Sequence, residues 1–205
     1  MPRRSYHLGR RQGAVERTQA RILKAVRALL VARGNPDFSI EAVARRARVT
    51  RVTVYQRFGT RSKLLEALFD QLARQGGMWD LADAFGQPDP EEALARFVTT
   101  FARFWTAHRP IHRRLQALAA LDTGLDRTLR ARQEWRRQGL RVIVPRLGQR
   151  SGGAAAEAQD ETIDLLFALT GFPMFDLLAG PQRTPADVAP IVLRVARAVL
   201  GLAAR

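Results

Sequence analysis

The stretch that decides the fold runs from Ser39 to Phe58 and reads SIEAVARRARVTRVTVYQRF. It contains two short helical patterns, Ile40–Ala47 and Arg51–Phe58, separated by the break Arg48-Val49-Thr50. A hydroxyl residue stands before each pattern, where a side-chain oxygen can accept hydrogen bonds from the first free N–H groups of a helix. The stretch therefore predicts two short helices joined by a tight turn.

The residue types in this stretch suit a pair of helices that cross closely. Ala44 is small enough to lie at the crossing, and Phe58 closes the end of the second helix. Apolar residues that can hold the pair together are Ile40, Val43, Ala47, Val49 and Val54. The outer face of the second helix is polar, with Arg51, Thr53, Gln56 and Arg57. This pattern is typical of a helix-turn-helix, whose second helix enters the major groove of DNA.

The charge of the chain is concentrated around this motif. Residues 1–74 hold 17 Arg and Lys against 5 Asp and Glu, a net +12, whereas residues 75–205 hold 17 against 14, a net +3. A basic N-terminal part on a nearly neutral remainder is typical of a phosphate-binding module attached to a second domain. Charge alone would also fit a solvated basic face or an anionic membrane surface.

The flanking sequence completes a two-domain, all-α organisation of about nine helices. Helices are expected at Val15–Arg33 and Arg61–Arg74 on either side of the motif. Residues 1–14 are then a basic N-terminal arm, and residues 15–74 are the three-helix helix-turn-helix DNA-binding domain together with its fourth helix. Residues 75–205 are expected to form a helical regulatory and dimerisation domain. The later helices are expected at Glu91–Ala107, Pro110–Ala120, Leu125–Gln149, Glu157–Leu178 and Pro185–Ala203.

The last two of these helices are apolar nearly all round, which is typical of a helix covered on every side. One face can be covered by the chain itself and the other by a second copy. A homodimer through Glu157–Leu178 and Pro185–Ala203 is therefore expected, with a purely internal core as the alternative. Two-fold symmetry would call for a roughly palindromic DNA site.

Three segments match the sequence pattern of a known protein family: Phe38–Ala44, Val49-Thr50-Arg51 and Tyr55–Arg61. Together they resemble the N-terminal domain of TetR-family regulators over about residues 18–70. The likeness beyond residue 75 is one of helix count and order. The resemblance implies a sequence-specific transcriptional regulator of double-stranded DNA, a repressor released from its operator by a small apolar or amphipathic ligand. An activator, or a non-specific architectural DNA-binding protein, remains the alternative.

The resemblance also implies roles for particular residues. Those facing base edges or the groove wall would be Arg51, Val52, Tyr55 and Gln56, and those holding phosphates Thr53, Arg57 and Arg61. Ser39, Thr50 and Thr60 would cap the second, third and fourth helices and are also counted among the expected DNA-binding residues. Plain packing is the alternative for Tyr55, and a solvated surface role the alternative for Arg57 and Arg61.

One position departs from the family pattern. Arg48 stands in the turn where glycine is usual, because glycine tolerates a positive φ. A non-glycine residue there costs roughly 1 kcal/mol. Arg48 could in return add a phosphate contact.

In the second domain, the resemblance implies a small-molecule pocket. The candidate walls share aromatic or imidazole side chains: Phe101, Phe104, Trp105, His108, Trp135 and Phe172. An aromatic stripe at helical spacing is also the pattern of an ordinary core, and this remains the alternative.

Several other functions are disfavoured by what the chain lacks. There is no Cys, no G-x-S-x-G, no P-loop and no G-x-G-x-x-G, so no enzyme activity or cofactor is expected. His108 and His112 have a metal-binding spacing, but Pro110 lies between them and no metal site is expected. The longest strongly apolar run, Leu165 to Phe175, has eleven residues, too short for a membrane span. With no signal sequence visible, a cytoplasmic location is expected.

Overall fold

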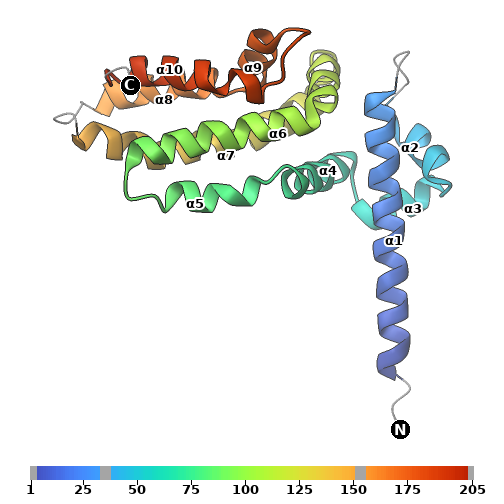
Figure 1. Cartoon of the computed structure of the whole chain (residues 1–205). Helices are drawn as coiled ribbons and strands as arrows, with labels where there is room; N and C mark the ends of the chain where they lie inside the picture. Colours follow the sequence, from blue (N-terminus) through green and yellow to red (C-terminus); the bar gives the residue numbers. More distant parts are fainter. Residues whose placement is uncertain (1–3, 33–37, 151–155, 203–205) are drawn as a thin grey trace. The chain divides into compact units, whose positions relative to one another are not determined.

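The computed structural model describes residues 4–32, 38–150 and 156–202, with the backbone alone for 4–11, 150 and 156–158. Within these ranges the chain is helical and has no strand, as the sequence predicts (Figure 1). The elements are α1 (Arg4–Val31), α2 (Ile40–Ala47), α3 (Arg51–Phe58), α4 (Arg61–Gln75), η1 (Met78–Asp80), α5 (Leu81–Phe85), α6 (Pro90–Ala119), α7 (Thr123–Arg150), α8 (Ala156–Leu169), α9 (Phe172–Ala179), η2 (Ala186–Val188) and α10 (Ala189–Val199).

The chain divides into two compact units. The first contains residues 1–71 together with 113–128, and the second contains residues 72–112 together with 129–205. The predicted boundary at residue 74 did not include the segment 113–128, which holds the end of α6 and the start of α7. The first unit therefore contains a segment that is distant in sequence from its other helices.

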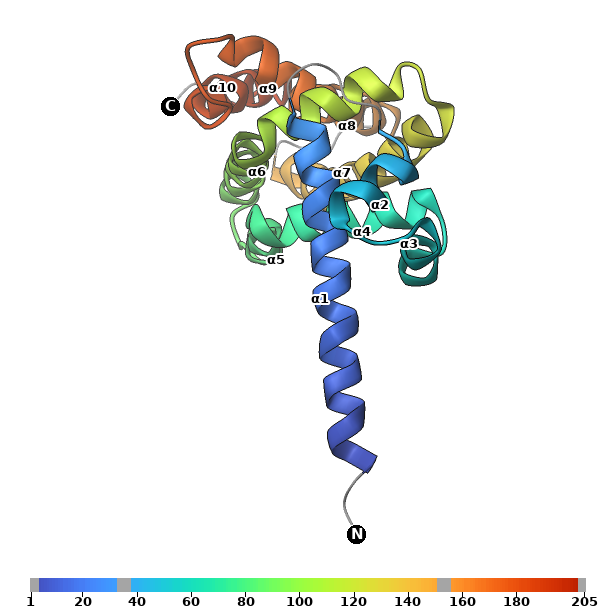
Figure 2. The same ribbon diagram turned by 90° about the vertical axis from the view of Figure 1, so that its right-hand side faces the viewer.

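In the first unit, α1 packs against α2 and α3 (Figure 2). Ile22, Val26 and Leu30 supply the buried face of α1, as their spacing predicts, and Val43 and Val54 are buried on α2 and α3. The bounds of α2 and α3 are those predicted from the sequence.

All three predicted N-caps are confirmed. The Ser39 hydroxyl accepts a hydrogen bond from the Ala42 N–H at 3.2 Å, and the Thr50 hydroxyl accepts one from the Thr53 N–H at 3.1 Å. The Thr60 hydroxyl accepts one from the Lys63 N–H at 3.1 Å. Each bond satisfies a donor that the helix itself leaves free.

The first helix is longer than predicted. It begins at Arg4 rather than Val15, so most of the segment expected as a basic arm continues α1. Residues 1–3 of that arm, and the end of the predicted helix at Arg33, lie outside the described residues.

In the second unit, α8 and α10 lie side by side over α6 and α7 (Figures 1 and 2). The core is formed by large side chains that are almost wholly buried, among them Leu94, Phe97, Leu140, Ile143 and Phe175.

Of two predicted helix boundaries in this unit, one is confirmed and one is wrong. The expected break between Ala107 and Pro110 is present as a kink that divides α6 into two helical parts, with His108 at the non-helical angles φ −126°, ψ 18°. A kink is expected there because the Pro110 ring crowds the carbonyl of Thr106 and lacks an N–H. The expected single helix Glu157–Leu178 is two helices, because Pro173 would crowd the Leu169 carbonyl in the same way. Gly171 is extended at this break, with φ −74°, ψ 153°.

Within the described ranges, no single helix is long and apolar enough to cross a bilayer. Only the bent pair Gln159–Leu169 and Phe172–Ala179, which meet at 48°, reaches that length and composition when the halves are taken together.

Candidate functional site

The turn between α2 and α3 has the left-handed geometry that the sequence predicts. Arg48 has φ 52° and ψ 50°, the only positive φ of a non-glycine residue in the described part of the chain. Its N–H donates to the Arg45 carbonyl at 3.2 Å, and the Val49 N–H donates to the Ala44 carbonyl at 3.0 Å. These bonds close the C-terminal end of α2 and hold the turn in a conformation that strains a residue with a Cβ.

Most of the predicted apolar contact between α2 and α3 is confirmed. Ala44 is buried, and so are Ile40, Val43, Ala47 and Val54, whereas Val49 is only half-buried. Because α2 and α3 are only eight residues each, this small apolar contact sets their crossing. The outer face of α3 is thereby fixed in direction.

That outer face is exposed. Val54 is the only buried residue of α3, whereas Arg51, Val52, Tyr55 and Gln56 are exposed. The exposed fraction is 62% for Val52 and 43% for Tyr55, which disfavours packing as the role of Tyr55. Figure 2 shows α3 at the edge of the first unit. An exposed face that carries a guanidinium, an amide, a phenol and an isopropyl group offers both hydrogen bonds and apolar contact to base edges.

Arg51 forms an ion pair with Glu41 of α2. The Arg51 Nη1 lies 2.7 Å from Glu41 Oε1, and both side chains are at least half exposed. Exposed pairs of this kind contribute about 0–1 kcal/mol. Arg51 can therefore exchange Glu41 for another acceptor at small cost.

The predicted phosphate contacts lie around this face. Arg48 and Thr60 are exposed, and Thr53 and Arg57 are half-buried. The Thr53 hydroxyl lies 2.9 Å from that of Thr50, so the two hydroxyls share a hydrogen bond at the N-terminus of α3.

Arg61, by contrast, is held within the first unit. Its Nη1 forms an ion pair with Asp122, its Nη2 donates to the Phe38 carbonyl at 3.4 Å, and its guanidinium lies 5.2 Å from the centre of the Phe38 ring. The phosphate role predicted for Arg61 would compete with these contacts.

Asp122 is a residue that the sequence reasoning missed. Its Oδ1 accepts a hydrogen bond from the Leu125 N–H at 2.9 Å, at the start of α7. This bond and then the Arg61 guanidinium lower the pKa of the Asp122 carboxyl below its usual range. An Asp before a helical pattern could have indicated the cap, but its partner is distant in sequence.

In the second unit, five of the six predicted pocket residues come together. Phe101, Phe104, Trp105, His108 and Phe172 are all buried. The Trp105 ring lies 5.7 Å from Phe101, 4.9 Å from Phe104 and 5.7 Å from Phe172, measured between ring centres. We call Phe101, Phe104, Trp105 and Phe172 the aromatic cluster.

Trp135, the sixth predicted pocket residue, does not join them. Its side chain is 76% exposed, so its inclusion among the pocket walls was wrong. Successive residues of α7 face different sides of the helix. Arg136, the next residue after Trp135, is the one that is buried in the second unit.

His112 lies against the aromatic cluster. Its ring centre is 4.7 Å from that of Trp105, and its buried Nε2 has no hydrogen-bond partner. Burial, and then the neighbouring His108, lowers the pKa of His112 to about 3. His108 Nε2 lies 3.0 Å from the Leu72 carbonyl. The described residues contain no group of three or more His, Cys, Asp or Glu that could hold a metal ion.

Arg136 is a second buried residue that the sequence reasoning missed. It is 5% exposed, and its Nη1 donates to the Thr170 hydroxyl at 2.7 Å and to the Phe167 carbonyl. Burial, and then the charge of Arg137, lowers the pKa of Arg136 to about 9. A lone Arg in a basic helix gives no sequence signal of such burial.

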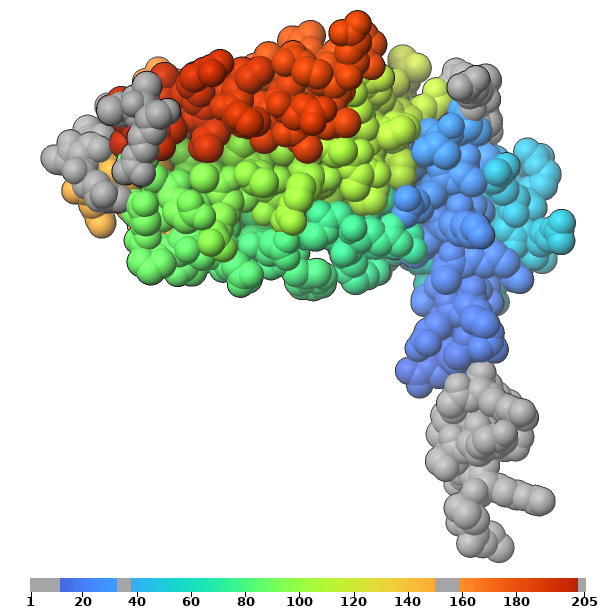
Figure 3. Space-filling model, in the orientation of Figure 1, coloured from blue at the N-terminus to red at the C-terminus, as the bar shows by residue number. Residues whose placement is uncertain are grey.

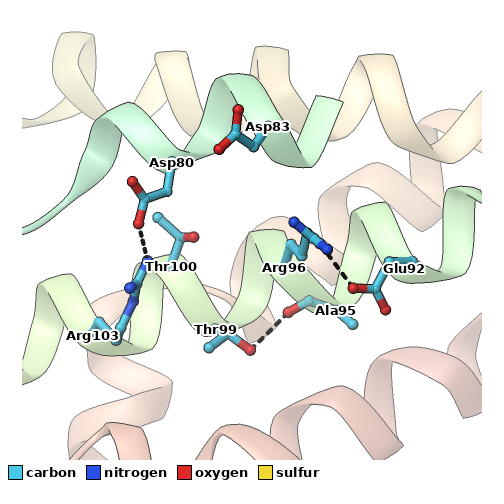
Figure 4. Close-up of a pocket in the computed structure, with 8 residues that line it drawn as sticks. All are labelled: Asp80, Asp83, Glu92, Ala95, Arg96, Thr99, Thr100 and Arg103. Carbon is cyan, nitrogen blue, oxygen red and sulfur yellow. Dashed lines mark hydrogen bonds and ion pairs between the residues drawn. The ribbon is translucent and has the colours of Figure 1, made fainter. Parts of the chain in front are cut away.

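The second unit also has an open hollow of about 360 Å³ (Figure 4), and no residue of the aromatic cluster is among those that line it. The lining residues of η1, α5 and α6 are polar except for Ala95: Asp80, Asp83, Glu92, Ala95, Arg96, Thr99, Thr100 and Arg103. Arg103 pairs with Asp80 at 2.5 Å, and Arg96 with Glu92 at 2.8 Å. The two arginines are thus neutralised within the hollow.

Comparison with known proteins gives matches to a family model and to solved structures. Residues 22–68 match the model described as "Bacterial regulatory proteins, tetR family". A search of curated proteins gave no match. The chain is similar in fold to NalD of Pseudomonas aeruginosa, the secondary repressor of the MexAB-OprM multidrug efflux pump, with 21% identity, 91% and 96% of the two chains covered, and a TM-score of 0.65.

Two further structures share this fold. The TetR-family regulator PfmR of Thermus thermophilus is 21% identical, with 90% of this chain and 99% of that chain covered and a TM-score of 0.60. A TetR-like regulator from Rhodococcus sp. RHA1 is 20% identical, with 90% and 96% covered and a TM-score of 0.59.

Proposed function

We propose that this chain, whose N-terminal domain is that of the tetR family of bacterial regulatory proteins, is a dimeric repressor of transcription. It would bind a roughly palindromic operator in the cytoplasm through α3 and leave it when a small apolar or amphipathic ligand binds the second unit. The observation that carries the proposal is the exposed face of α3, which is fixed in direction by the buried α2–α3 contact.

In this proposal Arg51 reads a guanine. An Arg at the N-terminal end of a recognition helix can donate two hydrogen bonds to guanine O6 and N7. Its exposed pair with Glu41 would open on binding. Val52 offers an apolar contact to a thymine methyl group, and Tyr55 and Gln56 complete the face toward the groove.

Phosphates would be held on either side of this helix. Thr53 and Arg57 of α3 and Arg48 of the turn supply side-chain donors, and Thr60 marks the N-terminus of α4, whose free N–H groups suit an anion. These contacts would fix the position of the protein on the duplex without reading sequence.

A second copy of the chain would cover the apolar outer face of α8–α10. Leu165, Leu177 and Val195 are exposed on these three helices, while Leu166, Phe175 and Val192 of the same helices are buried. Helices that are apolar on both their inner and outer faces suit a dimer interface. Figure 3 shows in red the surface that the C-terminal helices contribute to the second unit on one side.

A non-specific architectural DNA-binding protein is the second candidate, because a net charge of +12 in residues 1–74 suffices for sequence-independent binding. A second unit with its own buried core is more than DNA coating requires, and it favours the regulator.

The two candidates differ in what they select from random duplex DNA at near-physiological salt. A regulator of the proposed kind recovers a palindromic consensus with half-sites one helical turn, or a multiple, apart. Recovery of DNA without a consensus would support the architectural protein instead.

A further inference from the structure

We propose that the ligand of the second unit is an amphiphile with one carboxylate group, and that Arg136 binds this carboxylate beside the aromatic cluster. This inference rests on the proposed function, since it names the chemical class of the ligand that the second unit would take.

The charge of Arg136 is not compensated by a carboxylate. In the described part of the chain no carboxylate pairs with it, and its nearest charged neighbour in sequence, Arg137, adds a second positive charge. Both of its hydrogen bonds leave from Nη1, and its buried Nε has no partner. A buried guanidinium without a counter-ion is costly, and a carboxylate matches its planar pair of donors.

The Arg136 guanidinium lies next to aromatic rings. Its carbon is 4.0 Å from the centre of the Phe167 ring and 6.0 Å from that of Phe101. Thr170, which accepts a hydrogen bond from Arg136, also accepts one from the Trp105 indole through its carbonyl at 3.2 Å. The charge therefore stands at the edge of the aromatic cluster, where a ligand would place a polar head against Arg136 and an apolar body among the rings.

A second polar side chain with an unused atom, His112, also lies against the cluster. His112 is buried against Trp105 and Phe172, and its Nε2 has no partner. A neutral imidazole can donate to a ligand or accept from it. Two unused polar atoms around one set of aromatic rings are unusual in a core that serves packing alone.

A structural role for Arg136 is the competing explanation. Its bond to the Phe167 carbonyl caps the C-terminal end of α8, where a cation is favourable. That role uses Nη1 alone and needs no negatively charged partner. The experiment therefore has to separate the charge from the cap.

The test measures binding of matched probes to the full chain, without DNA, by calorimetry and by the shift in melting temperature. The probes are straight-chain and phenyl-terminated carboxylates of four to ten carbons, each paired with the alcohol and the amine of the same length. The wild type is expected to bind the best carboxylate about tenfold or more tighter than its alcohol, and not to prefer the amine.

Arg136→Gln, which removes the charge and keeps a polar side chain, is expected to lose this preference. Arg137→Gln, which removes a neighbouring charge that is paired with Asp164, is expected to keep it. Equal or absent binding of carboxylate and alcohol by the wild type would overturn the inference, whatever the variants do. Retention of the preference in Arg136→Gln would overturn it too.

Release of a selected operator by the same carboxylate is measured separately. Failure to bind any operator would contradict the proposed repressor while leaving the ligand measurement intact, so the two failures are distinguishable.

Discussion

Arg51 is the residue proposed to read the DNA sequence, so its substitution should affect operator binding directly. Arg51→Ala is expected to weaken binding to the selected operator by about 1–3 kcal/mol and to relax the preference at one base pair of each half-site. The reason is the loss of a bidentate contact with a base edge. Competition binding with operators changed at single positions measures both effects.

Arg45→Ala is the matched control, because it removes the same charge from an exposed position on α2. It should lower the affinity for operator and shuffled DNA to the same extent, if at all. If Arg51→Ala also loses equally on both kinds of DNA, Arg51 is a phosphate contact and not a reader.

Replacing Arg48 by glycine is expected to stabilise the folded chain. The φ of 52° at Arg48 strains a residue with a Cβ, and glycine removes this strain. After the added freedom of the unfolded chain is allowed for, Arg48→Gly is expected to raise the free energy of unfolding by about 0.5–1 kcal/mol. Chemical denaturation measures the change.

Arg46→Gly provides the contrast, since Arg46 is exposed in the helical last turn of α2. There glycine is expected to lower the free energy of unfolding by up to about 1 kcal/mol. Losses of equal size in both variants would mean that the turn at residue 48 is not strained in solution.

The roles of single residues were predictable where the cause is local. Ser39, Thr50 and Thr60 cap their helices, and Arg48 takes a positive φ, because each depends on the next few residues of the chain. Arg61 and Asp122 could not be paired from sequence, because 60 residues lie between them and nothing local links the two. The burial of Arg136 and the exposure of Trp135 depend on how α7 is turned, which periodicity left open.

Among the elements, the start of α7 depends on one carboxylate. Asp122→Ala removes both the cap of α7 and the partner of Arg61. The free energy of unfolding is expected to fall by about 1–3 kcal/mol, most of it from the cap, since the pair with Arg61 is partly exposed. Thermal or chemical unfolding measures the loss.

A double-mutant cycle with Arg61→Ala separates the two contributions. If the ion pair matters, the double variant loses less than the sum of the single variants. A coupling of zero would show that Arg61 gains nothing from Asp122, and would return Arg61 to the candidates for phosphate binding.

The helices whose bounds were predicted correctly have recognisable capping residues at their ends. α2 and α3 are bounded by caps and by the turn, so their limits could be read directly. α1 extends back to Arg4 through Gly9 and Gly13, residues that weaken a helix but do not end it. The split of α8 from α9 was missed because the apolar pattern continues across Gly171 and Pro173, although the proline was itself a signal of the break.

For the whole molecule, His112 predicts how stability depends on pH. Its pKa in the folded chain is about 3, against 6.5 for the unfolded side chain, so between these values the unfolded chain binds the extra proton. Stability is therefore full above pH 6.5 and falls as the pH is lowered, by up to about 1.4 kcal/mol per pH unit for this one group.

His112→Gln should flatten this slope between about pH 6.5 and 4.5. The wild type at about pH 8, where neither state of His112 is charged, gives the baseline against which each variant is compared. If the pH dependence of the free energy of unfolding is the same in His112→Gln as in the wild type, the pKa of His112 is not lowered by folding.

The proposed dimer predicts how substitutions on the outer face of α8–α10 change the oligomeric state. Leu165→Asp places a charge on the apolar outer face of α8 and is expected to shift the chain to monomers in sedimentation equilibrium. Leu121→Asp, at an exposed leucine of the first unit, should leave the dimer intact. Dissociation by both variants, or by neither, would argue against the α8–α10 face.

Whether α3 reads DNA sequence is measured by the ratio of affinities for the selected operator and for a shuffled duplex of equal length, at near-physiological salt. A ratio of about 10³ or more is predicted, with two protomers on each operator. Equal affinity for the two duplexes would contradict sequence readout by α3 and leave only a basic protein that coats DNA.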